Sequence, residues 1–126
     1  MTKEIYILYI EDERPMLELV RQALKFSGYN VTGATSGRRG LEMMRTKKPD
    51  LVLLDLMMTD INGWDVYRVM KTDEKLANVP VIVITAKIPD HDLLIVDDLP
   101  PVNDYITKPF DIKRLLNSVN RLLVDS

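Results

Sequence analysis

Apolar runs alternate with amphipathic stretches along the whole chain, and this alternation restricts the fold more than any other feature of the sequence. The clearest runs, rich in β-branched residues, span 5–10, 51–54 and 81–84. Short runs of this kind are typical of strands that are buried on both faces of a sheet. Weaker candidates at 30–34 and 104–107 bring the predicted set to five strands.

Between the apolar runs the pattern changes to the period of a helix. Residues 112–123 show it best, because their apolar side chains recur at spacings of three and four and Asp111 is placed to cap the first turn. Gly28 stands just past the end of a helix that follows the first strand. Ser36 and Asn62 stand at the starts of two more.

Strands that alternate with helices predict an α/β fold, a doubly wound parallel sheet with helices on both faces and right-handed crossovers. One segment departs from the pattern. Residues 89–101 hold four apolar residues in a row, then two acids and two prolines, so a fourth helix there is expected to be short or irregular. In such sheets ligands bind beyond the carboxyl ends of the strands, near the point where the strand order reverses.

Composition excludes several classes of function. The chain has 126 residues and no cysteine, which rules out disulfides, thiol catalysis and Cys-type zinc sites. Its single histidine, His91, argues against a His-rich metal centre. The 17 basic and 19 acidic residues form no long basic run, so direct nucleic-acid binding is not expected. No apolar run is long enough to span a membrane, so membrane insertion is not expected. A cytoplasmic location is expected, with which the absence of cysteine is compatible.

Polar residues follow the predicted strands on one edge of the sheet. Glu11 and Asp12 follow the first strand, Asp55 the third, Thr85 the fourth and Lys108 the fifth. Two carboxylates about 4 Å apart repel by roughly 4 kcal/mol at an effective dielectric constant of 20. Such a cluster therefore keeps a proton or binds a cation. A few carboxylates, a backbone carbonyl and water suit octahedral Mg²⁺ better than Ca²⁺.

Carboxylates, Mg²⁺, an amine and a hydroxyl around one aspartate make a phosphoryl-transfer site. Asp55 would attack phosphorus and form an acyl phosphate. Mg²⁺ and Lys108 would neutralise charge on the transferred oxygens, and Thr85 could donate a hydrogen bond to one of them.

The sequence closely resembles the receiver domains of two-component response regulators over essentially its whole length. The matching segments are 7–13, 49–58, 62–63, 80–87 and 103–110. The resemblance implies a flavodoxin-like (βα)5 fold with strand order 2-1-3-4-5. It also implies that residues 1–126 form a single receiver domain, which receives a phosphoryl group from a sensor histidine kinase or a phosphotransfer protein.

The resemblance assigns roles to residues at the predicted edge. Asp55 would be the phosphoacceptor, and Lys108 would contact the phosphoryl group. Asp12, Asp55 and the backbone carbonyl of Met57 would bind Mg²⁺. Glu11, which stands where the family more often has Asp, would bind the ion directly or through water.

Further residues correspond to the family's switch. Thr85 would turn toward the phosphoryl group while the ring of Tyr105 moves inward behind it, and Met57 and Lys87 would tune how fast the phosphate is lost. The family usually contacts a downstream protein target through its fourth helix, fifth strand and fifth helix. Here residues 100–102 replace the usual Gly-Ala, which predicts a shortened or partly unwound fourth helix.

The resemblance favours a signalling switch over an enzyme, and other readings are weaker. A phosphorelay shuttle or phosphate sink remains open, as does a stand-alone regulator of the chemotaxis kind. A flavodoxin-type cofactor protein would need a hydroxyl- and glycine-rich loop after the first strand, where acidic residues 11–13 would repel a phosphate. A phosphatase similar to the haloacid dehalogenases would need a second Asp where Met57 stands.

Overall fold

The computed structural model describes residues 4–58, 60–86 and 100–124 and shows five strands and four helices there. The strands are β1 (Tyr6–Ile10), β2 (Asn30–Ala34), β3 (Leu51–Asp55), β4 (Val81–Thr85) and β5 (Asp104–Thr107). The helices are α1 (Arg14–Phe26), α2 (Gly37–Thr46), α3 (Gly63–Thr72) and α5 (Ile112–Val124). The predicted fourth helix would lie mainly within 87–99, outside the described residues.

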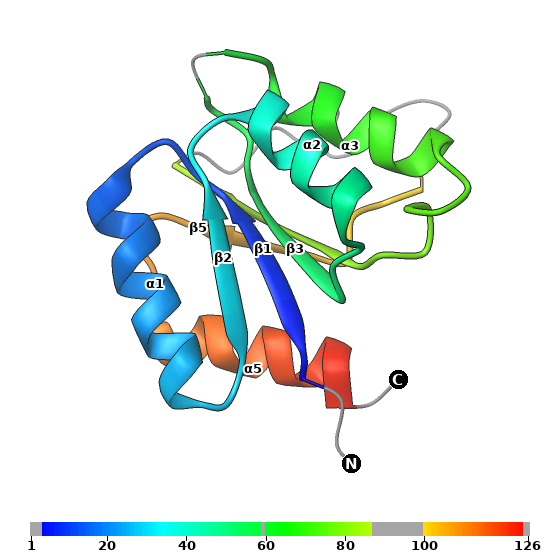
Figure 1. The fold of residues 1–126 in the computed structure, drawn as a ribbon. Coiled ribbons are helices and arrows are strands. Elements are labelled where there is room, and N and C mark those ends of the chain that lie inside the picture. The colour runs from blue at the N-terminus through cyan, green and yellow to red at the C-terminus, as the bar shows by residue number, and fades with distance from the viewer. Residues whose placement is uncertain (1–3, 59, 87–99, 125–126) are drawn as a thin grey trace.

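All five strands are parallel and lie in the order β2-β1-β3-β4-β5. Figure 1 shows α1 and α5 on one face of the sheet and α2 and α3 on the other. The predicted doubly wound α/β fold and its strand order are therefore confirmed. None of the helices in the described part of the chain has the length and apolar character needed to cross a bilayer.

The central strands are apolar throughout because both of their faces are covered. In β1, Ile7 and Tyr9 belong to the core under α1 and α5, called here the α1/α5 core. Leu8 and Ile10 belong to the core under α2 and α3, called here the α2/α3 core. Successive side chains of a strand point to opposite faces of the sheet, so one continuous apolar run supplies both cores.

Polar caps fix where the helices begin, as the sequence predicts. The side chain of Ser36 accepts a hydrogen bond from the Arg39 amide, and that of Asn62 accepts one from the Trp64 amide. Asp111 accepts from the amide of Lys113 at 2.8 Å in the first turn of α5. These bonds satisfy amides that have no partner within their own helix.

The start of α3 lies directly against the end of β3. A Cβ atom on Gly63 would lie 2.6 Å from the Cα of Leu56 and 2.7 Å from the carbonyl oxygen of Asp55. Both of these atoms belong to the backbone, which cannot rotate aside. Glycine at this position therefore lets α3 begin beside the residue that ends the central strand.

Replacing Gly63 with alanine is expected to cost about 1–3 kcal/mol of the free energy of unfolding, because the added methyl group displaces backbone. Urea denaturation of the two proteins measures this cost. Gly33→Ala is the matched control, since the three atoms nearest to its Cβ all belong to the Leu17 side chain, the nearest at 2.3 Å, and a side chain can rotate aside. A cost for Gly33→Ala equal to that for Gly63→Ala would contradict the argument.

Candidate functional site

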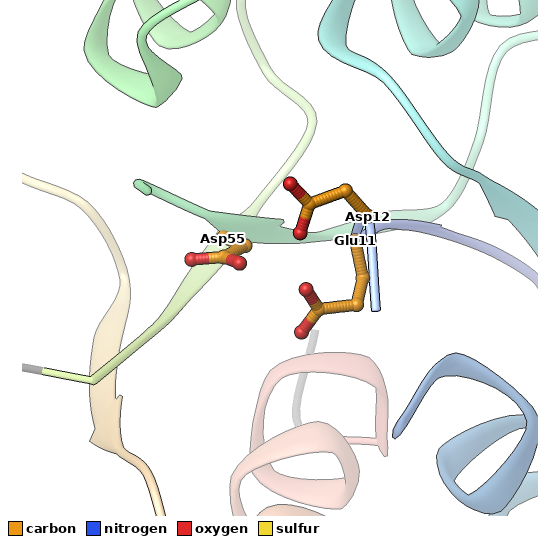
Figure 2. Close-up of side chains that lie close together, drawn as sticks. All are labelled: Glu11, Asp12 and Asp55. Atoms are coloured by element: carbon orange, nitrogen blue, oxygen red, sulfur yellow. The ribbon is translucent and has the colours of Figure 1, made fainter. Parts of the chain in front are cut away.

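Three carboxylates meet where β1 and β3 end side by side. Glu11 and Asp12 directly follow β1, and Asp55 is the last residue of β3. One carboxylate oxygen from each lies within 4.8 Å of the others. Figure 2 shows Glu11 and Asp12 extending to opposite sides of the chain, with both carboxylates turned toward Asp55. The structure thus brings together the three acids that the sequence places at this edge.

Lys108 supplies the positive charge of the cluster. Its Nζ atom lies 2.5 Å from Glu11 Oε1 and 3.4 Å from Asp55 Oδ2. Its backbone amide donates to the carbonyl oxygen of Thr85 at 2.8 Å, which holds the segment after β5 against the end of β4. The ammonium group therefore sits between two acids that come from different strands.

Burial determines how the charges are distributed. Glu11 is fully buried, and Asp55 is only 3% exposed. Burial, reinforced by the hydrogen bond with Glu11, raises the pKa of Asp55 to about 6. Burial also acts to raise the pKa of Glu11, but hydrogen bonds with Asp55 and Lys108 outweigh it and hold that pKa below its usual value.

The pKa of Lys108 is raised, because the hydrogen bond to Glu11 and the charge of Asp55 outweigh the opposing effect of burial. Glu11 and Lys108 thus form a charged pair. The charged form is less favourable for Asp55 than for Glu11.

The donor set fits a hard divalent cation. Three carboxylates with one ammonium group leave two formal negative charges to be balanced. Oxygen ligands in this number, with room left for water, are those that Mg²⁺ binds. The amide of Met57 donates to Asp55 Oδ1 at 3.0 Å, so the chain after β3 folds back over the acid. This places Met57 next to Asp55, and the role of its carbonyl oxygen stays a prediction.

Thr85 and Tyr105 lie on one face of neighbouring strands. Thr85 ends β4 and is only 2% exposed. Asp55 pairs with Ile84 in the register of β3 and β4, so Thr85 reaches the same edge as the acids. Alternation along β4 puts Thr85 on the face of Val83, in the α2/α3 core against which Tyr105 packs. Lys87 lies outside the described residues.

Asp60 connects the loop after β3 to α2, and this contact was not predicted from the sequence. Its carboxylate accepts hydrogen bonds from the amides of Gly37 at 3.0 Å and Arg38 at 3.1 Å. The loop that follows β3 is thereby attached to the first turn of α2. Nothing in the local sequence signals this contact, because an acid in a polar loop is common and its partners are 22 and 23 residues away.

The hydroxyl group of Tyr9 was also missed. It donates to Glu11 Oε1 at 3.0 Å from inside the α1/α5 core. The signal that could have found it is the spacing of two residues, which puts both side chains on the same side of the extended chain where β1 ends.

Comparison with known proteins identifies the family. The profile of the response regulator receiver domain matches residues 7–120, and the chain belongs to this family. The response regulator SaeR of Staphylococcus aureus is 33% identical over 118 residues, which cover 94% of this chain and 50% of the relative. The chain thus spans about half the length of the curated relatives it matches.

Solved structures agree with this assignment. The signal receiver domain of a signal transduction histidine kinase from Syntrophus aciditrophicus is 28% identical, with a TM-score of 0.85 and coverage of 95% of this chain and 90% of that chain. The receiver domain of a putative LuxO repressor protein from Vibrio parahaemolyticus is 27% identical, with a TM-score of 0.87 and coverage of 98% and 92%. The chemotaxis protein CheY4 of Vibrio cholerae, at 20% identity, covers 96% of this chain and all of its own and shares the fold with a TM-score of 0.87.

The family defines a signalling domain rather than a classical enzyme, and its signalling depends on phosphorylation. Receiver domains interact with histidine kinases and downstream effectors. They generally bind Mg²⁺ at an acidic cluster, and Glu11, Asp12 and Asp55 form such a cluster here.

Removing the central carboxylate is expected to stabilise the protein in the absence of divalent cations. Because the pKa of Asp55 is raised from 3.8 to about 6, its charge disfavours the folded state above pH 6, and this cost disappears as the pH falls toward 4. Asp55→Asn is therefore expected to add about 1–3 kcal/mol to the free energy of unfolding at pH 7 and little at pH 4.

Urea denaturation in a chelating buffer at both pH values measures the effect. The control is Asp65→Asn, an exposed acid in the first turn of α3, which is expected to change stability by less than about 1 kcal/mol. An Asp55→Asn protein less stable than the wild type at pH 7 would contradict the argument that the buried charge of Asp55 destabilises the folded state.

Proposed function

We propose that this chain is a phosphorylation-dependent switch in which Asp55 accepts a phosphoryl group from a phosphohistidine. The donor would be a sensor histidine kinase or a phosphotransfer protein, and the site would act in the cytoplasm with Mg²⁺. One observation carries the proposal. Asp55 is buried at the end of the central strand, within reach of two further carboxylates and 3.4 Å from the ammonium group of Lys108.

The transfer would form one bond and break another. An Asp55 carboxylate oxygen attacks phosphorus and makes the new P–O bond, while the P–N bond to the donor histidine breaks and its electron pair stays on the imidazole nitrogen. Lys108 balances negative charge on the phosphoryl oxygens, and the hydroxyl group of Thr85 donates a hydrogen bond to one of them.

The residues that would hold the cation are Asp12, Asp55 and the backbone carbonyl of Met57, with Glu11 acting directly or through water. The ion would neutralise charge on the acids and on the transferred group, which lets an anionic phosphate approach an anionic cluster. This set agrees with the grouping of the three carboxylates within 4.8 Å and with the position of Met57 next to Asp55.

The phosphorylated state would be read by a downstream protein. Thr85 turning toward the phosphoryl group leaves space behind it, and Tyr105 on the same face of the sheet moves inward. The surface of β5 and α5 changes as a result. Met57, 58% exposed beside the acceptor, and Lys87 would tune the rate of phosphate loss.

Incubation with a small-molecule phosphodonor and Mg²⁺ is expected to add the mass of one phosphoryl group to the protein, located on Asp55. Intact-mass spectrometry detects the adduct, and peptide mapping after borohydride reduction places it. Asp55→Asn is expected to abolish the adduct, because the amide oxygen is a poor nucleophile. Removal of Mg²⁺ by a chelator is expected to suppress it in the wild type.

The matched control is Glu13→Gln, which removes an exposed carboxylate from the same acidic run without touching the cluster. This variant should be phosphorylated as the wild type is. An adduct of wild-type yield on the Asp55→Asn protein would overturn the proposed acceptor.

Thr85→Ala is expected to separate phosphorylation from the switch. Without the hydroxyl group, the variant should bind beryllofluoride with Mg²⁺ at Asp55, yet the amide NMR shifts of β5 should change much less than in the wild type. Thr85→Ser keeps the hydroxyl group and should restore the response. Equal β5 shifts in Thr85→Ala and the wild type would contradict the assignment of Thr85.

A further inference from the structure

Tyr9 joins the core of the protein to the acidic cluster. Its side chain is fully buried in the α1/α5 core, and its hydroxyl group donates to Glu11 Oε1 at 3.0 Å. A buried phenol needs a hydrogen-bond partner. Tyr29 and Tyr67 have neutral partners here, Asn120 Oδ1 and the carbonyl oxygen of Pro100. Tyr9 instead donates to a carboxylate of the candidate site.

The two oxygens of Glu11 have different surroundings. Oε1 accepts from both the Tyr9 hydroxyl group and the Lys108 ammonium group, at 3.0 and 2.5 Å. Oε2 accepts a longer bond of 3.3 Å from the amide of Glu13. Two donors occupy Oε1, so Oε2 has more capacity for a further ligand than Oε1 does.

Glutamate at position 11 needs a contact like the hydrogen bond from Tyr9. Its side chain has one more rotatable bond than aspartate, and each free torsion adds positions that its carboxylate can occupy. Lys108 alone does not fix the arm, because its own long side chain also contacts Asp55. The Tyr9 hydroxyl group approaches from the rigid core, and together the two donors select one position of the carboxylate.

We propose that Tyr9 is a positioning residue that fixes the Glu11 carboxylate, with Oε1 held by Tyr9 and Lys108 so that Oε2 could serve Mg²⁺ directly or through water. This inference rests on the proposed function, since it concerns the same cation. Tyr9 itself does not touch the phosphoryl group or the ion. It acts through Glu11, and its hydroxyl group compensates for the longer arm.

Tyr9→Phe removes the hydroxyl group and keeps the buried ring. Hydrogen-bonding partners of metal ligands typically change metal affinity by 10–100-fold when removed. We expect the dissociation constant for Mg²⁺ to rise about tenfold, as measured by amide NMR shifts during a Mg²⁺ titration of the whole chain. The Mg²⁺ concentration for half-maximal phosphorylation should rise with it, while the rate at saturating Mg²⁺ stays unchanged.

Tyr29→Phe is the matched control. It removes the hydroxyl group of another buried tyrosine in the same α1/α5 core, and that group bonds to Asn120 rather than to an acid of the cluster. This variant should bind Mg²⁺ as the wild type does, even if its stability falls. An equal loss of Mg²⁺ affinity in both variants would overturn the proposal, because the effect would then be general to the core.

A double-mutant cycle tests whether Tyr9 acts through Glu11. Glu11→Asp shortens the arm, which withdraws the carboxylate from the hydroxyl group. In that background Tyr9→Phe should leave the Mg²⁺ dissociation constant unchanged, whereas independent effects would multiply. A full tenfold loss in both backgrounds would overturn the proposal.

The outcomes separate this inference from the proposed function. If the wild type binds Mg²⁺ and becomes phosphorylated while Tyr9→Phe has the same Mg²⁺ affinity, the inference is wrong and the function stands. If the wild type binds Mg²⁺ but takes up no phosphoryl group, the function is wrong and the two tyrosine variants still test Tyr9. A wild type that does not bind Mg²⁺ would overturn both.

Discussion

Repulsion among three carboxylates, partly offset by one ammonium group, is the constraint on which the rest of this structure depends. Two carboxylates about 4 Å apart cost roughly 4 kcal/mol at an effective dielectric constant of 20, and Glu11 and Asp55 are both buried. Lys108 offsets part of that cost through its contacts with both acids. Burial, reinforced by the hydrogen bond with Glu11, nevertheless raises the pKa of Asp55 to about 6. A site in this state is stabilised by a cation, and it suits a reaction that consumes the charge of Asp55.

The parallel sheet makes this concentration of charge possible. The strand ends of β1, β3, β4 and β5 lie at one edge, so residues up to 97 positions apart in the chain become neighbours. Apolar packing on both faces supplies the stability that the edge lacks. The first turn of α3 closes against Asp55 only because position 63 is glycine, and Asp60 attaches the loop after β3 to α2. The sheet, the first turn of α3 and the attached loop thus surround Asp55, whose charge is disfavoured by burial.

Sequence alone predicts the parts of this arrangement that depend on local periodicity. The apolar runs locate β1, β3 and β4, the caps at Ser36, Asn62 and Asp111 locate helix starts, and the rule that strand ends share an edge brings the acids together. Contacts between side chains distant in the sequence were not predicted. The bond from Asp60 to α2 depends on a loop conformation, and the preference of Lys108 for Glu11 over Asp55 depends on which torsions packing allows. Neither leaves a periodic signal.

The two faces of the sheet divide the proposed function between them. Tyr9, Glu11 and Lys108 form a connected set on the side of α1 and α5, and this set holds the charges around Asp55. Thr85 and Tyr105 lie on the side of α2 and α3, where a change at the edge can be passed to the surface. Side chains alternate along a strand, so neighbouring residues face opposite sides of the sheet. One side would hold the acids in place, and the other would transmit the structural change to the surface. A switch of this design would move Thr85 and Tyr105 on one face of the sheet while Tyr9 and Lys108 keep their contacts with Glu11 on the other.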